Sequence, residues 1–187
     1  MKCKIRFKRL LVTGIAAAAA AGPLASVAHA EPEAPTVPTE IEVEAGNKVF
    51  LVGHATGVQI YRCNATSGGY RWDFVAPRAD LFDDHGKFIA NHFGGPTWQA
   101  KDGSKVVGQL VRGVVVDQTA IAWLKLSRAT SSAGPAGDRL AGTSFIQRTA
   151  TVGGLAPAAD TCDAGAVGDI AEIPYTADYH FWKGTGS

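Results

Sequence analysis

The sequence is poor in cysteine and methionine, with three and one in 187 residues, and it lacks the short motifs that mark many enzymes and metal proteins. It contains no Cys-x-x-Cys, Cys-x-x-His or His-Glu-x-x-His spacing, so we predict no metal site and no cofactor. The Gly-x-Ser-x-Gly turn that exposes a nucleophilic serine is also missing. Catalysis therefore has no local signature in this sequence.

The sequence also has no apolar run long enough for a transmembrane helix. Its longest run, Leu10–Ala21, is shorter than the ~20 residues needed to cross a bilayer. Five basic residues precede this run, and the small-x-small triplet Ala28-His29-Ala30 follows it. This order is typical of a secretory signal peptide, so we predict one over residues 1–30 with cleavage near Ala30. We expect a secreted protein, extracellular or in the cell envelope, with no membrane span in the mature chain.

The charge of the remaining chain is close to balanced. Five of the 18 Lys and Arg lie in residues 1–30 and none of the 17 acidic residues does, which leaves a net charge of −4. Five of those acids fall in residues 31–44, so residues 45–187 carry +1. A domain without a basic excess does not hold a phosphate backbone well, and we expect no nucleic-acid partner.

Two cysteines remain after the signal peptide, Cys63 and Cys162. In an oxidising compartment such a pair predicts a disulfide bond. Two free thiols or a cysteine-containing metal site are the alternatives, and no ligand spacing favours the latter.

Short apolar or alternating runs rich in β-branched and aromatic residues recur from residue 41 onward, and Gly- and Asp-Gly-containing turns separate them. This pattern predicts an all-β fold, a sandwich or barrel of short, mostly antiparallel strands with long Gly/Pro-rich loops. The predicted strands are 41–45, 49–52, 58–63, 70–75, 87–93, 106–111, 114–117, 121–126 and 143–152, with a closing strand within 174–182. Residues 127–142 are predicted to form a long loop, and a short helix has room in 155–173.

The mature chain divides into two parts. Residues 31–44 are acidic and contain three prolines, which predicts a flexible leader or an extended segment laid over the surface. Residues 45–187 are predicted to form a single β-rich domain.

The segment from Asn91 to Ala100 is dense in unusual residues. His92, Trp98 and Gln99 flank a Gly-Gly-Pro turn that would let a ligand approach the backbone, which makes them candidate ligand-binding residues. The alternative is a tight corner in which Trp98 fills the core and His92 bonds to the nearby backbone.

Two more segments carry candidate residues. Arg148 shares a strand face with Ile146, and an arginine among apolar residues either recognises a ligand carboxylate or pairs with an internal Asp; we favour internal pairing. The closing strand alternates Tyr175, Ala177, Tyr179 and Phe181 against polar residues, which predicts one aromatic face. That face packs in the core or, if exposed, stacks on sugar rings.

Several of these motifs together resemble one family of secreted bacterial and fungal proteins that is catalogued as a domain of unknown function. The resemblance spans roughly residues 45–182. It rests on Ile60-Tyr61-Arg62-Cys63, Trp72, Ala76-Pro77, Ala79-x-Leu81, His92-Phe93-Gly94-Gly95-Pro96-Thr97-Trp98, Asp102-Gly103-Ser104, Trp123-Leu124, Ile146-Gln147-Arg148, Thr151, Gly153-Gly154-x-Ala156-Pro157, Cys162 and Pro174-Tyr175-Thr176-Ala177-x-Tyr179. It implies one exported domain with a cysteine pair, and it brings no catalytic role.

We therefore predict a secreted binding or interaction module whose surface comprises His92, Trp98, Gln99 and Arg148. Its candidate partners are a small molecule, a glycan or an envelope protein. The alternative is an extracellular hydrolase or metal-assisted enzyme that uses His92 with an Asp from residues 80–84 and Arg148. An enzyme needs those polar groups within hydrogen-bonding distance in one cleft.

Overall fold

Residues 31–186 are described by the computed structural model, and the predicted signal peptide lies outside them. Eight antiparallel strands follow one another around a closed barrel, and the last pairs with the first, which confirms the all-β prediction. The strands are β1 (Asn47–Thr66), β2 (Gly69–Phe82), β3 (Phe88–Phe93), β4 (Thr97–Ala100), β5 (Lys105–Val114), β6 (Trp123–Ser132), β7 (Phe145–Gly153) and β8 (Ile170–Gly184).

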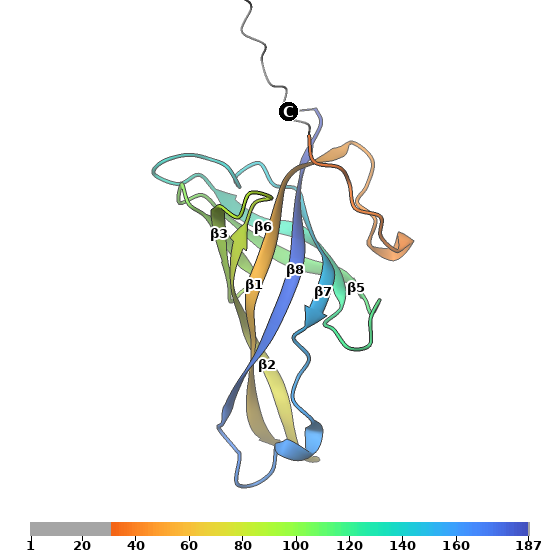
Figure 1. Ribbon diagram of the computed structural model, residues 1–187, viewed down its shortest axis with the longest axis vertical. Helices are drawn as coiled ribbons and strands as arrows, with labels where there is room; N and C mark the ends of the chain where they lie inside the picture. Colours follow the sequence, from red (N-terminus) through yellow and green to blue (C-terminus); the bar gives the residue numbers. More distant parts are fainter. Residues whose placement is uncertain (1–30, 187) are drawn as a thin grey trace, which may run out of the picture. The chain divides into compact units, whose positions relative to one another are not determined.

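Several strands are longer than the sequence predicts, and the difference is largest for β1, β2 and β8. β1 has 20 residues and joins two predicted strands, 49–52 and 58–63, while β2 and β8 have 14 and 15. The glycines inside β1 do not interrupt the strand; they allow the backbones of β1 and β2 to lie close together. A Cβ on Gly57 would lie 2.1 Å from the carbonyl oxygen of Arg78 on β2. Figure 1 shows β1, β2 and β8 running beyond the shorter strands to the lower end of the barrel.

Other predicted elements are corrected by the structure. Residues 41–45 form no strand; the chain there has one turn of 3-10 helix, η1 (Thr39–Ile41). Residues 114–117 lie mostly in the loop after β5, and the predicted loop 127–142 begins as the second half of β6 because Arg128 and Thr130 pair with β5. The helix in 155–173 is one 3-10 turn, η2 (Ala159–Thr161).

Apolar side chains fill one half of the barrel. Leu51, Leu81, Ile146 and Phe181 point inward from four strands and are almost fully buried. The loop after β6 covers this end by inserting Leu140, whose N–H donates to the Ser104 hydroxyl at 3.0 Å. Packing therefore closes this end of the barrel.

The segment 31–44 runs along the outside of the barrel, and its last residues, 41–44, pack against the barrel. Ile41 is fully buried, and its carbonyl oxygen accepts a 2.6 Å hydrogen bond from the Gln147 amide on β7. On β6, the Lys125 ammonium donates to the Glu42 carbonyl and to the Glu44 carboxylate, at 2.8 and 2.7 Å. These contacts hold the second half of the segment against β6 and β7.

A disulfide joins Cys63 near the end of β1 to Cys162 just after η2, as predicted, with their Cα atoms 5.4 Å apart. It fastens the long loop between β7 and β8 to the end of β1. This loop lies at the lower end of the barrel in Figure 1. Within residues 31–186, no helix has the length and apolar composition needed to span a bilayer.

Candidate functional site

The barrel wall is incomplete between β2 and β5 because the two strands between them are short. β3 pairs with β2 only along Ala79–Phe82, and β4 pairs with β5 only along Lys105–Val107. The first part of β2 and the second part of β5 therefore face each other across a gap, beneath the turn that joins β3 to β4. This gap is the opening of a pocket.

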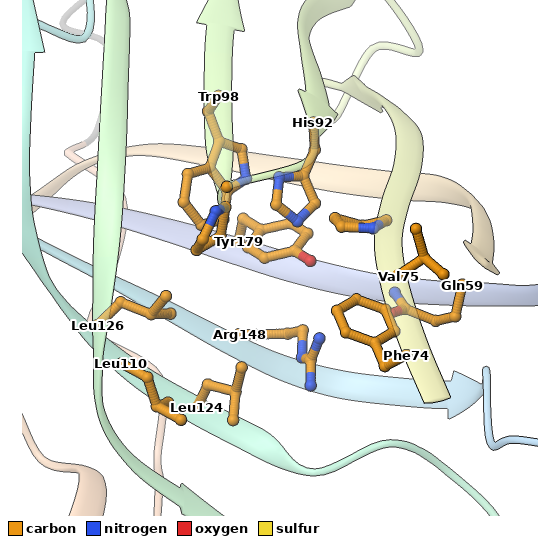
Figure 2. Close-up of a pocket in the computed structure, with 13 residues that line it drawn as sticks. Gln59, Phe74, Val75, His92, Trp98, Leu110, Leu124, Leu126, Arg148 and Tyr179 are labelled. Carbon is orange, nitrogen blue, oxygen red and sulfur yellow. The ribbon is translucent and has the colours of Figure 1, made fainter. Parts of the chain in front are cut away.

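The pocket has a volume of about 190 Å³, and Figure 2 shows the side chains that line it. Phe74 and Val75 on β2 and Leu110 on β5 line it, and they are 54, 51 and 59 % exposed. Side chains that line a cavity and also reach solvent mark its entrance. Deeper inside, Leu124 and Leu126 on β6 continue the apolar lining.

A stack of aromatic rings forms the inner wall of the pocket. The ring of His92 lies parallel to the Trp98 indole, with centroids 4.2 Å apart, and Tyr179 meets both rings edge-on (Figure 2). The pairing of β3 with β4 sets this contact, because His92 and Trp98 are directly opposite in register. The segment forms the tight corner of the second interpretation, with Trp98 buried and His92 bonded to the Thr97 carbonyl, and His92 and Trp98 also line the pocket. Ligand binding by these residues stays a prediction.

His92 is a neutral imidazole in this environment. Its Nδ1 lies 3.0 Å from the Thr97 carbonyl oxygen, which can only accept, so Nδ1 carries the proton. Burial lowers the pKa of His92 to about 3, and the charge of Arg148 acts in the same direction while the Thr97 bond opposes them. The proton-free Nε2 is therefore an acceptor at neutral pH.

Arg148 projects from β7 into the pocket (Figure 2). Its Nε and Nη2 both donate to the carbonyl oxygen of Ala122, at 3.1 and 2.8 Å. It forms no ion pair with any carboxylate of residues 31–186, so the favoured prediction of an internal Asp partner is wrong. The guanidinium charge instead faces a cavity lined mainly by carbon.

Two further polar residues, Gln59 and Tyr179, line the pocket together with Arg148, and Tyr175 contacts Tyr179. Gln59 on β1 is 2 % exposed, and its Nε2 has no hydrogen-bond partner in the described part of the chain. The hydroxyls of Tyr175 and Tyr179 are 3.3 Å apart, and burial raises the pKa of both, so they stay protonated. Nothing in this group carries a negative charge.

The structure brings three of the four predicted site residues together. His92, Trp98 and Arg148 line one pocket although they come from three strands. Gln99 follows Trp98 on β4 and so faces the outside, in register with Asn91 and Lys105.

Sequence reasoning missed Gln59, Phe74 and Leu110 as pocket residues. Gln59 gave a weak signal, as a polar residue on the inward face of an otherwise apolar strand. No local pattern marks Phe74 or Leu110, because only the shortness of β3 and β4 uncovers them.

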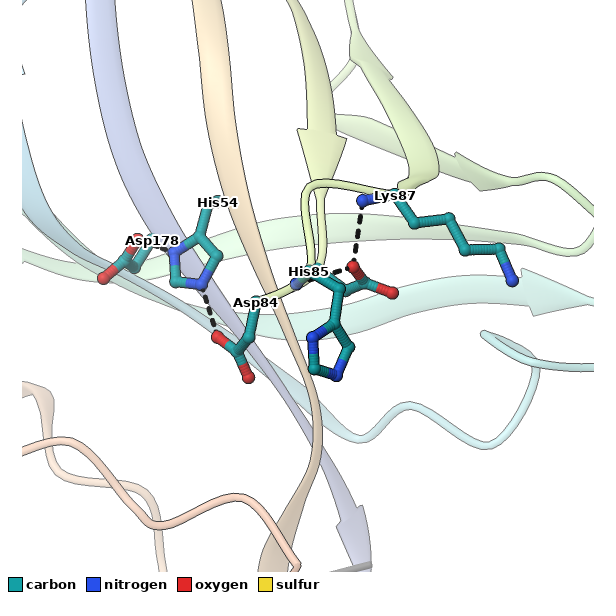
Figure 3. Close-up of polar contacts among 6 residues, drawn as sticks. His54, Asp84, His85, Lys87 and Asp178 are labelled. Carbon is teal, nitrogen blue, oxygen red and sulfur yellow. Dashed lines mark hydrogen bonds and ion pairs between the residues drawn. The ribbon is translucent and has the colours of Figure 1, made fainter.

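The histidine–aspartate pair of the enzyme alternative does not form at His92. Asp80 accepts a 2.6 Å bond from Asn91, and Asp83 caps the β2–β3 turn. Asp84 bonds instead to His54 Nε2 on the outer surface, at 2.8 Å, and Asp178 bonds to His54 Nδ1 at 2.7 Å (Figure 3). Hydrogen bonds to Asp84 and then to Asp178 raise the pKa of His54. The cluster therefore links β1 and β8 to the turn between β2 and β3.

The aromatic face of β8 points into the barrel. Tyr175, Tyr179 and Phe181 are at most 3 % exposed, so this face packs in the core and offers no open platform for sugars. Among residues 31–186, no three His, Cys, Asp or Glu side chains are placed to hold a metal ion.

The fold and the site define a class: a closed eight-stranded antiparallel barrel, packed at one end and hollowed at the other into a mostly apolar pocket. The chain belongs to the family described as "Protein of unknown function (DUF3455)", which matches residues 44–183. This confirms the resemblance to a family catalogued as a domain of unknown function. No curated protein and no solved structure is significantly similar to the chain.

Proposed function

We propose that this protein is a binding module that holds one small, largely apolar molecule inside its barrel. The observation that carries the proposal is the gap in the wall, where Phe74, Val75 and Leu110 line the pocket and remain half exposed. Exposed apolar side chains around a concave site are typical of ligand entrances. A glycan, with its many hydroxyls, fits this lining less well than an apolar molecule does.

The binding proposal suits the chemistry of the pocket better than the enzyme alternative. A general base works best with a pKa near the working pH, and burial holds the pKa of His92 at about 3. No carboxylate of residues 80–84 bonds to His92, so none raises its pKa; Asp80 and Asp84 have other partners.

We also propose that the domain works outside the cytoplasm. The predicted signal peptide supports this location, and so does the Cys63–Cys162 disulfide, because such bonds persist in oxidising compartments.

The test is ligand-observed NMR of the mature chain, residues 31–187, with toluene and indole as neutral probes. We expect both probes to bind, and Leu110→Asp to weaken binding because it places a charge at the entrance. Val111→Asp is the matched control: Val111 is the next residue on β5, is 51 % exposed and does not line the pocket. Absence of binding to the wild type, or equal loss in the two variants, would contradict the proposal.

A further inference from the structure

We propose that the ligand of this pocket carries a carboxylate that pairs with Arg148. The inference rests on the proposed binding function and adds the chemical class of the ligand. It follows from the hydrogen-bond donors of Arg148 and Gln59 that line the pocket and from the absence of negative charge among the residues that line it.

Arg148 is held in place yet keeps part of its binding capacity. The Ala122 carbonyl oxygen accepts hydrogen bonds from Nε and Nη2 on one side of the guanidinium. These two bonds fix the orientation of the planar group. A guanidinium has five N–H donors, so donors remain beyond the two that the Ala122 carbonyl accepts, and the neighbouring Tyr179 hydroxyl can accept from them but carries no counter-charge. A half-buried cation beside apolar side chains is costly without a counter-charge, and an incoming carboxylate matches the fork of donors.

Gln59 supplies a second, independent observation. Its side chain lines the same pocket and is 2 % exposed, and its Nε2 makes no close hydrogen bond within residues 31–186, although the Tyr175 hydroxyl lies within reach of the Gln59 side chain. Buried amide donors nearly always have a partner. A carboxylate can accept hydrogen bonds through both oxygens, so one group can satisfy Gln59 and Arg148 together.

The charge count favours a monoanion. Arg148 is the only cation that lines the pocket in the described chain, and the neighbouring tyrosines and His92 are neutral. A phosphate dianion would keep an unbalanced charge in an apolar cavity, whereas a carboxylate would not.

The volume sets the size of the ligand. An engineered protein cavity of ~150 Å³ holds benzene, and this pocket has about 190 Å³. One ring with a short chain and a carboxylate therefore fills it. Phe74 and Leu110 at the entrance would cover the apolar part of such a molecule.

The experiment compares three probes of one shape by isothermal titration calorimetry at pH 7: 3-phenylpropionate, 3-phenylpropionamide and 3-phenylpropylamine. We expect the acid to bind the mature chain about tenfold or more tightly than the amide, because hydrogen bonds to charged groups are the stronger ones. The amine should bind most weakly, since its charge has the same sign as that of Arg148.

Two variants locate the effect. Arg148→Gln should remove the preference for the acid, whereas Arg78→Gln, on the outer surface and paired with Glu172, should keep it. Gln59→Leu leaves Arg148 untouched, so it tests the acid preference independently if Arg148→Gln fails to fold; we expect it to reduce that preference.

Equal affinities for acid and amide would overturn the carboxylate inference and leave the binding proposal standing. Preference for the amine would also overturn it. Binding of none of the three probes, together with no binding of toluene or indole, would instead remove the proposed function itself.

Discussion

His92 shows at the scale of one residue how burial defines chemistry. It is 3 % exposed, stacked on Trp98, and bonded through Nδ1 to a backbone carbonyl. This surrounding favours the neutral ring and fixes its tautomer. The contacts that make His92 a poor base also hold its ring in a fixed position at the wall of the pocket.

This protonation state predicts a pH dependence of stability. Between the ordinary histidine pKa of 6.5 and about 3, the unfolded chain binds a proton that folded His92 does not. The free energy of unfolding therefore falls as the pH is lowered through this window, by up to about 1.4 kcal/mol per pH unit from this residue. His92→Gln should show a shallower fall in urea unfolding measured from pH 7 to pH 4.

His85→Gln is the control for this prediction, because His85 is exposed in the β2–β3 turn. Its stability should follow the wild-type pH profile. His180, whose pKa burial also lowers, is present in all three proteins and cancels in the comparison. A His92→Gln profile parallel to the wild type would contradict the assignment.

Arg148 illustrates the limit of reading a single residue from sequence. The sequence shows an arginine on an apolar strand face and leaves two partners open, a ligand carboxylate and an internal Asp. The structure places no described carboxylate beside it and sets it against the Ala122 carbonyl. The choice depends on which strands become neighbours, and residue 148 alone does not contain that information.

At the scale of elements, the close contact of β1 with β2 depends on a glycine at position 57. Gly57 faces Ala79 in register, and the space for a Cβ is already occupied by the backbone of β2. Without a side chain at this position the two long strands stay paired where β3 ends. They then continue together as one side of the pocket entrance.

Gly57→Ala should therefore destabilise the protein by about 1–3 kcal/mol or more, because the added methyl group meets a backbone that cannot rotate away. Gly68→Ala, in the β1–β2 turn, is the matched control: nothing lies within 4 Å of its Cβ position. Thermal and urea unfolding of both variants checks this. Equal stability would show that the strands do not approach as closely as described.

The lengths of β3 and β4 decide where the wall opens. They have six and four residues, against 14 in β2 and 10 in β5. The sequence predicts β3 well, as residues 87–93, from its apolar run between turn residues. It does not predict the gap, because a gap appears only when strands of unequal length are laid side by side.

For the whole molecule, the disulfide is the main long-range covalent restraint. It joins residues 99 apart in the sequence and fixes the loop between β7 and β8 to the end of β1. The chain-entropy estimate for a loop of this size is roughly 4–5 kcal/mol. Reduction should therefore lower the melting temperature of the mature protein markedly, as measured by circular dichroism with and without dithiothreitol.

The double variant Cys63→Ser/Cys162→Ser provides the control. It should melt near the temperature of the reduced wild type and should not respond to dithiothreitol. A wild type whose melting temperature is unchanged by reduction would show that the bridge contributes little to stability.

By itself, the sequence determined the all-β class, the cysteine pair and the presence of one aromatic face on the closing strand, because these depend on local alternation and residue type. It also pointed to His92, Trp98 and Arg148 as unusual residues. Only the tertiary structure decided that these three share one pocket, that Gln99 faces outward, and that β1 is one strand instead of two. Those outcomes depend on which backbones pair and how far, and the pairing is set by contacts between residues distant in the chain.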